Sequence, residues 1–198
     1  MFKYKNGDTN NIFSNKQVNL TGTNATQKAW FNATYLEAQK LAKANDLFPS
    51  IMMSQAIAES AWGQSELATK ANNLFGIKAD TTWKGAKYNT LTTEVAEVDG
   101  KVVDYTGKTI SVKTGQSYKI YADFRKYNSQ AESLKDYVTK LKTTMNGSAY
   151  RYQAAWRSNA KTYQNAAKAL QAGGYATATD YATNLINRIV NYRLDTLD

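Results

Sequence analysis

The chain has 198 residues with 42% apolar content, which is enough for a single domain with its own core. Cysteine and histidine are both absent from the sequence. This excludes disulfides, thiolate and HExxH metal sites, and Ser-His or Cys-His catalysis, so we expect neither a metal nor another cofactor. The acid and base groups that remain are 16 carboxylates together with tyrosine and lysine.

The formal net charge is +9 and the pI is about 9.5, which predicts attraction to polyanions. The basic residues are spread along the whole chain, without a dense Lys/Arg run or a motif that reads a nucleic-acid groove. We therefore favour an anionic cell wall over nucleic acid as the partner. The alternative is a charge that serves only solubility. No apolar run approaches 18 residues, so we expect no membrane span.

Two elements precede the centre of the sequence. Residues 1–24 are polar and rich in asparagine, and we expect an extended N-terminal lead-in there, followed by one domain over residues 25–198. Over residues 26–44 apolar side chains recur at roughly the helical period, which predicts an amphipathic helix that faces the core.

A central helix is predicted to begin at Pro49, because the first turn of a helix tolerates proline. From Ser50 to Trp62 nearly every residue is apolar or small, and a helix that is apolar all round is a buried one. Glu59 is its one charge, so its carboxylate should face the interior or a cleft. Desolvation there raises a carboxyl pKa, as a general acid requires near neutral pH. The alternative is a structural acid paired with an arginine.

A short helix over residues 65–71 and a turn over residues 72–78 are expected next. Beyond them, glycine, threonine, valine and tyrosine dominate residues 83–124, and alternation replaces the helical period. This pattern predicts a small antiparallel β lobe whose first strand contains Glu94.

Three turns are expected inside this lobe. The Asp-Gly pair at residues 99–100 lies between two β-prone runs and is a strong hairpin signal. Further turns are predicted at residues 105–108 and 114–116.

The last third of the chain reads as helical. Ser129 followed by Glu132 has the pattern of a capping box and predicts a helix over residues 130–143. Three further helices are expected: residues 149–156, residues 160–170 after an Asn159 cap, and residues 181–193. Arg125, ahead of these helices, is a natural partner for a buried carboxylate. The sequence leaves three partners open: Glu59, Glu94 and Asp123.

Several motifs resemble those of the bacterial N-acetylglucosaminidases of glycoside hydrolase family 73, which are peptidoglycan hydrolases with a lysozyme-like fold. The motifs are ESAWGQS at residues 59–65, NLFGIK at 73–78, FRKYNS at 124–129 and GYATATDY at 174–181. In the last motif Ala178-Thr179 replaces the family's Asp-Pro pair. The resemblance covers about residues 45–190 and implies a mainly α (α+β), lysozyme-like domain. A β-hairpin lobe, at about residues 83–124, would flank the substrate groove.

The resemblance also implies roles for individual residues. Glu59 would be the general acid, and Glu94 the second acidic residue of the site, with Glu97 and Asp99 as weaker candidates. The alternative for Glu94 is a solvated strand residue. The substrate-contacting residues that the resemblance implies are Tyr175, Asn73, Phe75, Trp62 and Tyr127. For Phe75 and Tyr175, the alternative is plain packing.

The implied activity is hydrolysis of the β-1,4 bond after N-acetylglucosamine in peptidoglycan, by a secreted, monomeric protein of the cell wall. The alternatives are a muramidase or lytic transglycosylase on the same fold, or a wall-binding domain without catalysis. Residues 1–8 lack the apolar stretch of a signal peptide, so for a secreted protein we expect a signal ahead of this sequence or another export route.

Overall fold

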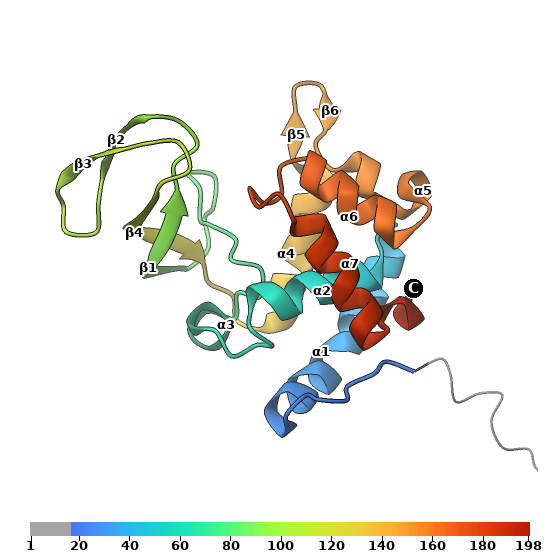
Figure 1. Cartoon of the computed structure of the whole chain (residues 1–198). Coiled ribbons are helices and arrows are strands. Elements are labelled where there is room, and N and C mark those ends of the chain that lie inside the picture. Colours follow the sequence, from blue (N-terminus) through green and yellow to red (C-terminus); the bar gives the residue numbers. More distant parts are fainter. Residues whose placement is uncertain (1–16) are drawn as a thin grey trace, which may run out of the picture.

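The computed structural model describes residues 17–198 and shows a helical body with a β lobe beside it (Figure 1). The helices of this part of the chain are α1 (Ala25–Ala44), α2 (Pro49–Glu59), α3 (Glu66–Ala71), α4 (Gln130–Thr143), α5 (Arg157–Ala160), α6 (Tyr163–Ala172) and α7 (Tyr181–Tyr192), with 3-10 turns η1 (Gln153–Ala155) and η2 (Leu194–Leu197). Of the expected lead-in, residues 1–16 lie outside the described residues. Residues 17–24 contain neither helix nor strand, and Asn19 N donates to Tyr192 O (2.8 Å).

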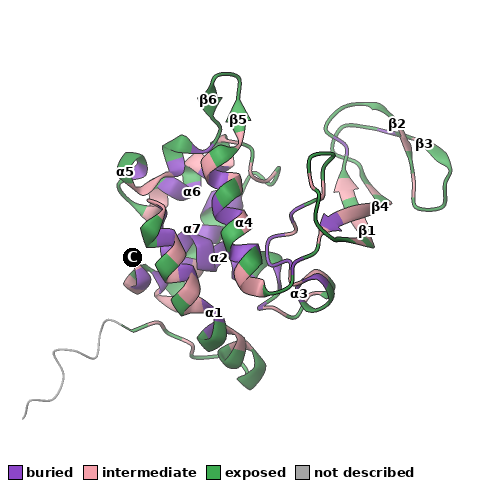
Figure 2. Ribbon diagram, turned by 180° about the vertical axis from the view of Figure 1, so that it is seen from behind, coloured by how far each residue is buried: buried purple, intermediate pink, exposed green. Residues whose placement is uncertain are grey.

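Helix α2 forms the centre of the helical body. Each of its residues from 49 to 57 is buried (Figure 2), and α1, α6, α7 and η2 pack around it. This confirms the prediction of a buried central helix that begins at Pro49. The buried amide of Gln55 is satisfied within the core, because it donates to Tyr181 OH (2.7 Å) and accepts from Tyr137 OH.

Helix α2 ends at Glu59 and not at Trp62, the end expected from its apolar run. Ala61 and Trp62 adopt left-handed backbone angles (φ 49° and 59°), which do not continue a right-handed helix. The turn then passes through Gly63 (φ 73°), where an added Cβ would lie 2.1 Å from the Trp30 ring. The early end leaves Glu59 at the exposed C-terminal end of a helix that is buried from residue 49 to residue 57.

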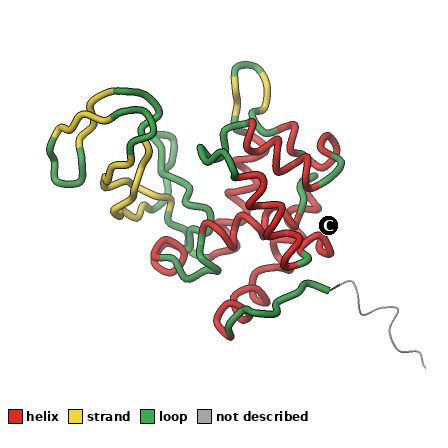
Figure 3. The backbone as a smooth tube through the Cα atoms, viewed as in Figure 1, coloured by secondary structure: helices red, strands yellow, loops and turns green. Residues whose placement is uncertain are grey.

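The β lobe consists of two antiparallel ribbons, one nested inside the other along the chain (Figure 3). The outer ribbon pairs β1 (Lys87–Val95) with β4 (Ser117–Arg125), and the inner ribbon pairs β2 (Gly100–Val103) with β3 (Thr109–Val112). The antiparallel lobe predicted for residues 83–124 is therefore confirmed.

The hairpin predicted at residues 99–100 is wrong, because β1 pairs with β4 and not with β2. Asp99 instead accepts hydrogen bonds from Lys113 Nζ and Thr114 N, both at 2.8 Å, and so ties the entry of β2 to the exit of β3. The tight hairpin lies at residues 105–108, the second expected turn.

The C-terminal third departs from the prediction at two places. Residues 149–156 were expected to be helical, but a small hairpin occupies their first part and η1 follows it. Its strands are β5 (Met145–Asn146) and β6 (Ala149–Tyr150), and the chain turns between them at Gly147 (φ 62°). The N-cap of α6 is Thr162 and not Asn159. Helices α1, α4 and α7 lie where the sequence places them.

A buried turn at residues 73–78 joins the helical body to the β lobe. Asn73 Nδ2 donates to the carbonyls of Ile77 (3.0 Å) and Arg125 (2.8 Å). Its Oδ1 accepts from the backbone N–H groups of Phe75 (3.3 Å) and Ile77 (3.1 Å). One side chain thus satisfies four backbone groups, and an isolated antiparallel bridge continues from this turn onto β4.

We predict that Asn73→Ala destabilises the fold by about 3 kcal/mol or more, because it leaves several buried backbone groups without partners, at about 1–3 kcal/mol each. Chemical denaturation of the purified variant measures this. Asn191→Ala, on the exposed face of α7, is the control and should change the free energy of unfolding by less than about 0.5 kcal/mol. Equal stability of the two variants would contradict the role assigned to Asn73.

Candidate active site

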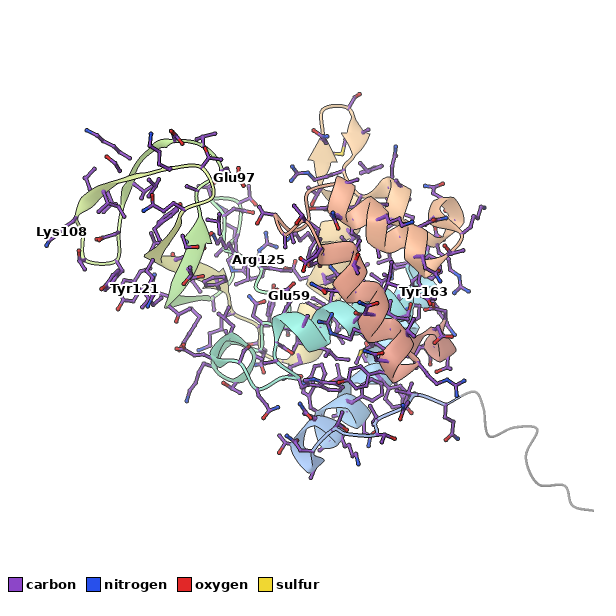
Figure 4. The ribbon with its side chains drawn as sticks, in the orientation of Figure 1. Glu59, Glu97, Lys108, Tyr121, Arg125 and Tyr163 are labelled. Carbon is purple, nitrogen blue, oxygen red and sulfur yellow. The ribbon has the colours of Figure 1, made fainter. Side chains whose placement is uncertain are left out.

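Glu59 lies at the open end of α2, on the side that faces the β lobe (Figure 4). It lines a hollow of about 360 Å³, which we call the Glu59 hollow. The residues that line it are Glu59, Leu67, Phe75, Gly76, Lys78, Thr92, Glu94, Phe124, Lys140, Tyr175 and Ala176. Residues from the central helix, the 73–78 turn, both strands of the outer ribbon, α4 and the α6–α7 loop thus meet around one carboxyl group.

Burial raises the pKa of the Glu59 carboxyl above its ordinary value of 4.5, and the positive charges of Lys140 and Arg188 offset part of this rise. Glu59 is nevertheless accessible to solvent. The two observations agree, because a carboxyl in a hollow loses much of its surrounding water while one side stays open to a ligand. The C-terminal end of α2 further disfavours a negative charge.

The raised pKa has a thermodynamic consequence for the fold and a chemical one for the site. The fold favours the protonated form of Glu59, so this group's contribution to stability is present at low pH and is lost as the pH rises through the raised pKa. A carboxyl that keeps its proton longer than a solvated one is suited to general-acid catalysis.

Glu94 lines the same hollow from β1, so the structure brings the two predicted carboxylates together. Its side chain is 24% exposed, and its Oε1 lies 2.7 Å from Lys78 Nζ. The strand alternates half-buried and exposed residues, and Thr92 and Glu94 belong to the half-buried set that faces the hollow. The weaker candidates line no hollow that contains Glu59: Glu97 is exposed on the lobe (Figure 4), and Asp99 bonds to Lys113 and Thr114, just after β3.

Tyr175 lines the Glu59 hollow, whereas its hydroxyl is buried and has no hydrogen-bond partner among the described residues. The ring packs against those of Tyr137, Tyr152 and Tyr181, with centroids 5.8 to 6.4 Å apart. Burial raises the pKa of Tyr175 well above its ordinary value, so the phenol stays protonated. A buried hydroxyl without a partner is unusual enough to call for a role.

The other predicted contacts divide into one that lines the hollow and three that do not. Phe75 lines it and stacks on Tyr137 (4.3 Å between centroids). Trp62 lies in the core, where it meets Trp30 and Tyr192 edge to face, so we assign it to packing. Asn73 and Tyr127 are also buried outside the Glu59 hollow.

Tyr127 and Arg125 belong to a polar cluster beneath the lobe. Tyr127 OH donates to Asp136 (2.7 Å), and Arg125 Nη1 donates to both carboxylate oxygens of Asp136 (3.0 Å each). Arg125 Nη2 binds Asp80 (3.1 Å). None of the three partners considered for Arg125 is correct, because the acids that bind it lie on α4 and in the loop before β1.

Two residues near Glu59 escaped the sequence analysis. Glu66 lines a second hollow of about 210 Å³ with Glu59, and it accepts hydrogen bonds from Tyr88 OH (2.7 Å) and Thr90 Oγ1 (3.2 Å) on β1. Lys140 reaches the Glu59 hollow from α4 and lies over the Tyr175 ring, 4.8 Å from its centroid. On sequence alone both are ordinary charges of a helix surface.

Within residues 17–198, no group of three acidic side chains is close enough together to hold a metal ion. No helix of the same part of the chain is long and apolar enough to cross a membrane.

Comparisons with known proteins agree with this geometry. The Glucosaminidase family, described as mannosyl-glycoprotein endo-beta-N-acetylglucosaminidase, matches residues 35–194. The exo-glucosaminidase LytG of Bacillus subtilis (strain 168) is 36% identical over 172 residues, which are 87% of this chain and 54% of that protein. A probable N-acetylmuramidase of Lactococcus lactis subsp. cremoris is 35% identical over 182 residues, 89% of this chain and 36% of that protein.

Among solved structures, the catalytic domain of the autolysin Auto from Listeria monocytogenes is similar over 90% of this chain and 91% of its own, with a TM-score of 0.71 and 37% identity. The chain spans about half or less of the two curated relatives, but nearly the whole of this catalytic domain. The resemblance of the motifs and the lysozyme-like architecture are thereby confirmed, and the chain belongs to the glucosaminidase family of glycoside hydrolases.

Proposed function

We propose that the chain hydrolyses the β-1,4 bond after N-acetylglucosamine in bacterial peptidoglycan. The observation that carries the proposal is the Glu59 carboxyl, which has a raised pKa and shares one hollow with a second carboxylate, Glu94. Glycoside hydrolysis uses two such groups, one to protonate the leaving oxygen and one to assist on the other face of the sugar.

In this proposal Glu59 donates its proton to the glycosidic oxygen as the bond breaks. Glu94 then acts as a base on water or as a nucleophile, and the separation of the two carboxyl groups in the substrate complex decides between them. A gap of about 5–5.5 Å is typical of retention and about 6.5–9.5 Å of inversion. The N-acetyl group of the substrate is the remaining alternative to Glu94.

The partner is the glycan strand of an anionic wall, which the net charge of +9 attracts. The Listeria relative is an autolysin, and this supports action outside the cell. We propose a secreted monomer. The Lactococcus relative is named a probable N-acetylmuramidase, so cleavage of the other glycosidic bond is the second candidate.

Mass analysis of the fragments released from purified peptidoglycan tests the proposal. We expect a reducing N-acetylglucosamine end. Glu59→Gln, which keeps the shape but carries no acidic proton, should stay folded and release about 10²- to 10⁴-fold less product. A reducing N-acetylmuramic end would favour the muramidase, a 1,6-anhydro end the transglycosylase, and no release by the wild-type protein a binding domain.

A second experiment tests Glu94. Glu94→Gln should lower kcat by about ten-fold or more and leave KM within about two-fold, because the charge acts on the transition state. Glu97→Gln is the matched control, since it removes an exposed carboxylate of the same lobe. Full activity of Glu94→Gln would remove this residue from the mechanism and leave the N-acetyl group in its place.

A third experiment separates the two readings of Tyr175. If its hydroxyl finds a partner only when the sugar binds, Tyr175→Phe raises KM while the free energy of unfolding stays equal or increases, because the buried hydroxyl is unpaired in the free protein. Tyr181→Phe is the control, since the Tyr181 hydroxyl already accepts from Gln55 and its loss should destabilise the fold. Unchanged kinetics of Tyr175→Phe would leave packing as its role.

A further inference from the structure

A hollow that is larger than the Glu59 hollow lies beside it and does not contain Glu59. Its volume is about 530 Å³, within the range of ligand sites, and we call it the lysine hollow. It lies between the start of the β lobe and the C-terminal half of α4, and Lys78 and Lys140 line both it and the Glu59 hollow. The two hollows therefore border each other at these two lysines.

The charges around the lysine hollow are not all engaged. Arg125 and Asp80 both line it and are paired with each other (3.1 Å). The Arg125 guanidinium also donates twice to Asp136 and once to the Lys78 carbonyl, so four of its five N–H groups are used. Lys78 is paired with Glu94. For Lys140, by contrast, no carboxylate in residues 17–198 lies within ion-pair distance, and its ammonium makes no hydrogen bond there. It is half-buried, and burial lowers its pKa.

The remaining wall offers acceptors. Thr139, Thr143 and Thr144 line the hollow. Each hydroxyl donates its proton to the backbone carbonyl of the α4 residue four positions earlier. A hydroxyl that already donates still has lone pairs, so toward a ligand it acts as an acceptor. The lysine hollow thus presents a cation that lies over an aromatic ring but has no carboxylate within ion-pair distance, beside a row of acceptors. The ligand that fits this arrangement carries carboxylates together with N–H groups, as an acidic peptide does.

We propose that the lysine hollow binds the acidic peptide that peptidoglycan carries on its lactyl group beside the cleaved bond, with Lys140 on a peptide carboxylate. The inference rests on the proposed function, because it places the glycan in the Glu59 hollow. The shared lysines make the connection: a peptide that branches from a sugar next to Glu59 enters the second hollow between Lys78 and Lys140.

The test compares kcat/KM on three soluble glycan oligomers of one length: with free-acid peptides, with the peptide carboxylates amidated, and with the peptides removed. For wild-type protein we expect the free-acid strand to be preferred about ten-fold or more over either of the others, as a hydrogen bond between charged groups implies. Lys140→Met, which keeps the apolar stem of the side chain, should lower this preference about ten-fold. Any effect of the variant on Glu59 is common to the three strands and cancels in the ratio.

Two further variants control the measurement. Lys140→Arg keeps the charge and should restore most of the preference. Lys135→Met removes an exposed lysine of α4 that lines neither hollow, and it should leave the ratio unchanged.

A preference that is the same in Lys140→Met and wild type, while all strands are cleaved, would overturn the inference and leave the proposed function intact. If wild type cleaved no strand, the proposed function would fail. In that case the affinities of wild type and Lys140→Met for the free-acid and peptide-free strands would still test the inference. Tighter binding of the free-acid strand by wild type, lost in Lys140→Met, would support the peptide site, and equal affinities would overturn it.

Discussion

The structure depends on one constraint: a helix that is apolar and buried over most of its length must place its single charge where water can reach it. Helix α2 meets it by stopping at Glu59, where left-handed residues 61–63 turn the chain away. Trp62 then folds back into the core against Trp30 and Tyr192, so the turn is held by aromatic packing. The same packing that covers the helix therefore opens its last residue to the β lobe.

The outer ribbon of the β lobe, which carries Glu94, is attached to this core by polar contacts. Asn73 fixes the 73–78 turn, and Arg125 with Asp136 fixes the base of β4, so the outer ribbon leaves the body at a defined place. Glu66 adds a contact between α3 and β1, through Tyr88 and Thr90, on the other side of Glu59. The position of Glu94 thus depends on three polar contacts that lie outside the Glu59 hollow.

Local patterns were sufficient to predict much of this arrangement. The period of α1, the proline of α2 and the Ser129 cap of α4 are local signals, and the structure confirms all three helices. The motif around Glu59 also pointed to the correct family. The hairpin at residues 99–100 was predicted wrongly, because Asp99 bonds to Lys113 and Thr114, which lie in the next turn of the lobe.

The other differences between prediction and structure arise from contacts between residues that are distant in the sequence. Arg125 pairs with Asp80 and Asp136, and only the folded lobe brings these acids to it. Trp62 follows Glu59 by three residues, yet after the left-handed turn its ring lies in the core against Trp30 and Tyr192, whereas Glu59 lines the hollow. The sequence around Lys140 does not predict a role for it, because its place in the site depends on the two hollows that it lines in the folded chain.

The central claim is that burial in the hollow raises the pKa of Glu59, and a direct titration of its carboxyl tests this. Carbon NMR of glutamate-labelled protein, with Glu59→Gln to assign the signal, gives its pKa in the folded state. We predict a midpoint above 4.5, a further rise in Lys140→Met because the Lys140 charge lowers it, and a fall of kcat as the pH rises through the same value. A midpoint at or below 4.5, or a kcat that falls at a pH unrelated to this titration, would contradict the account.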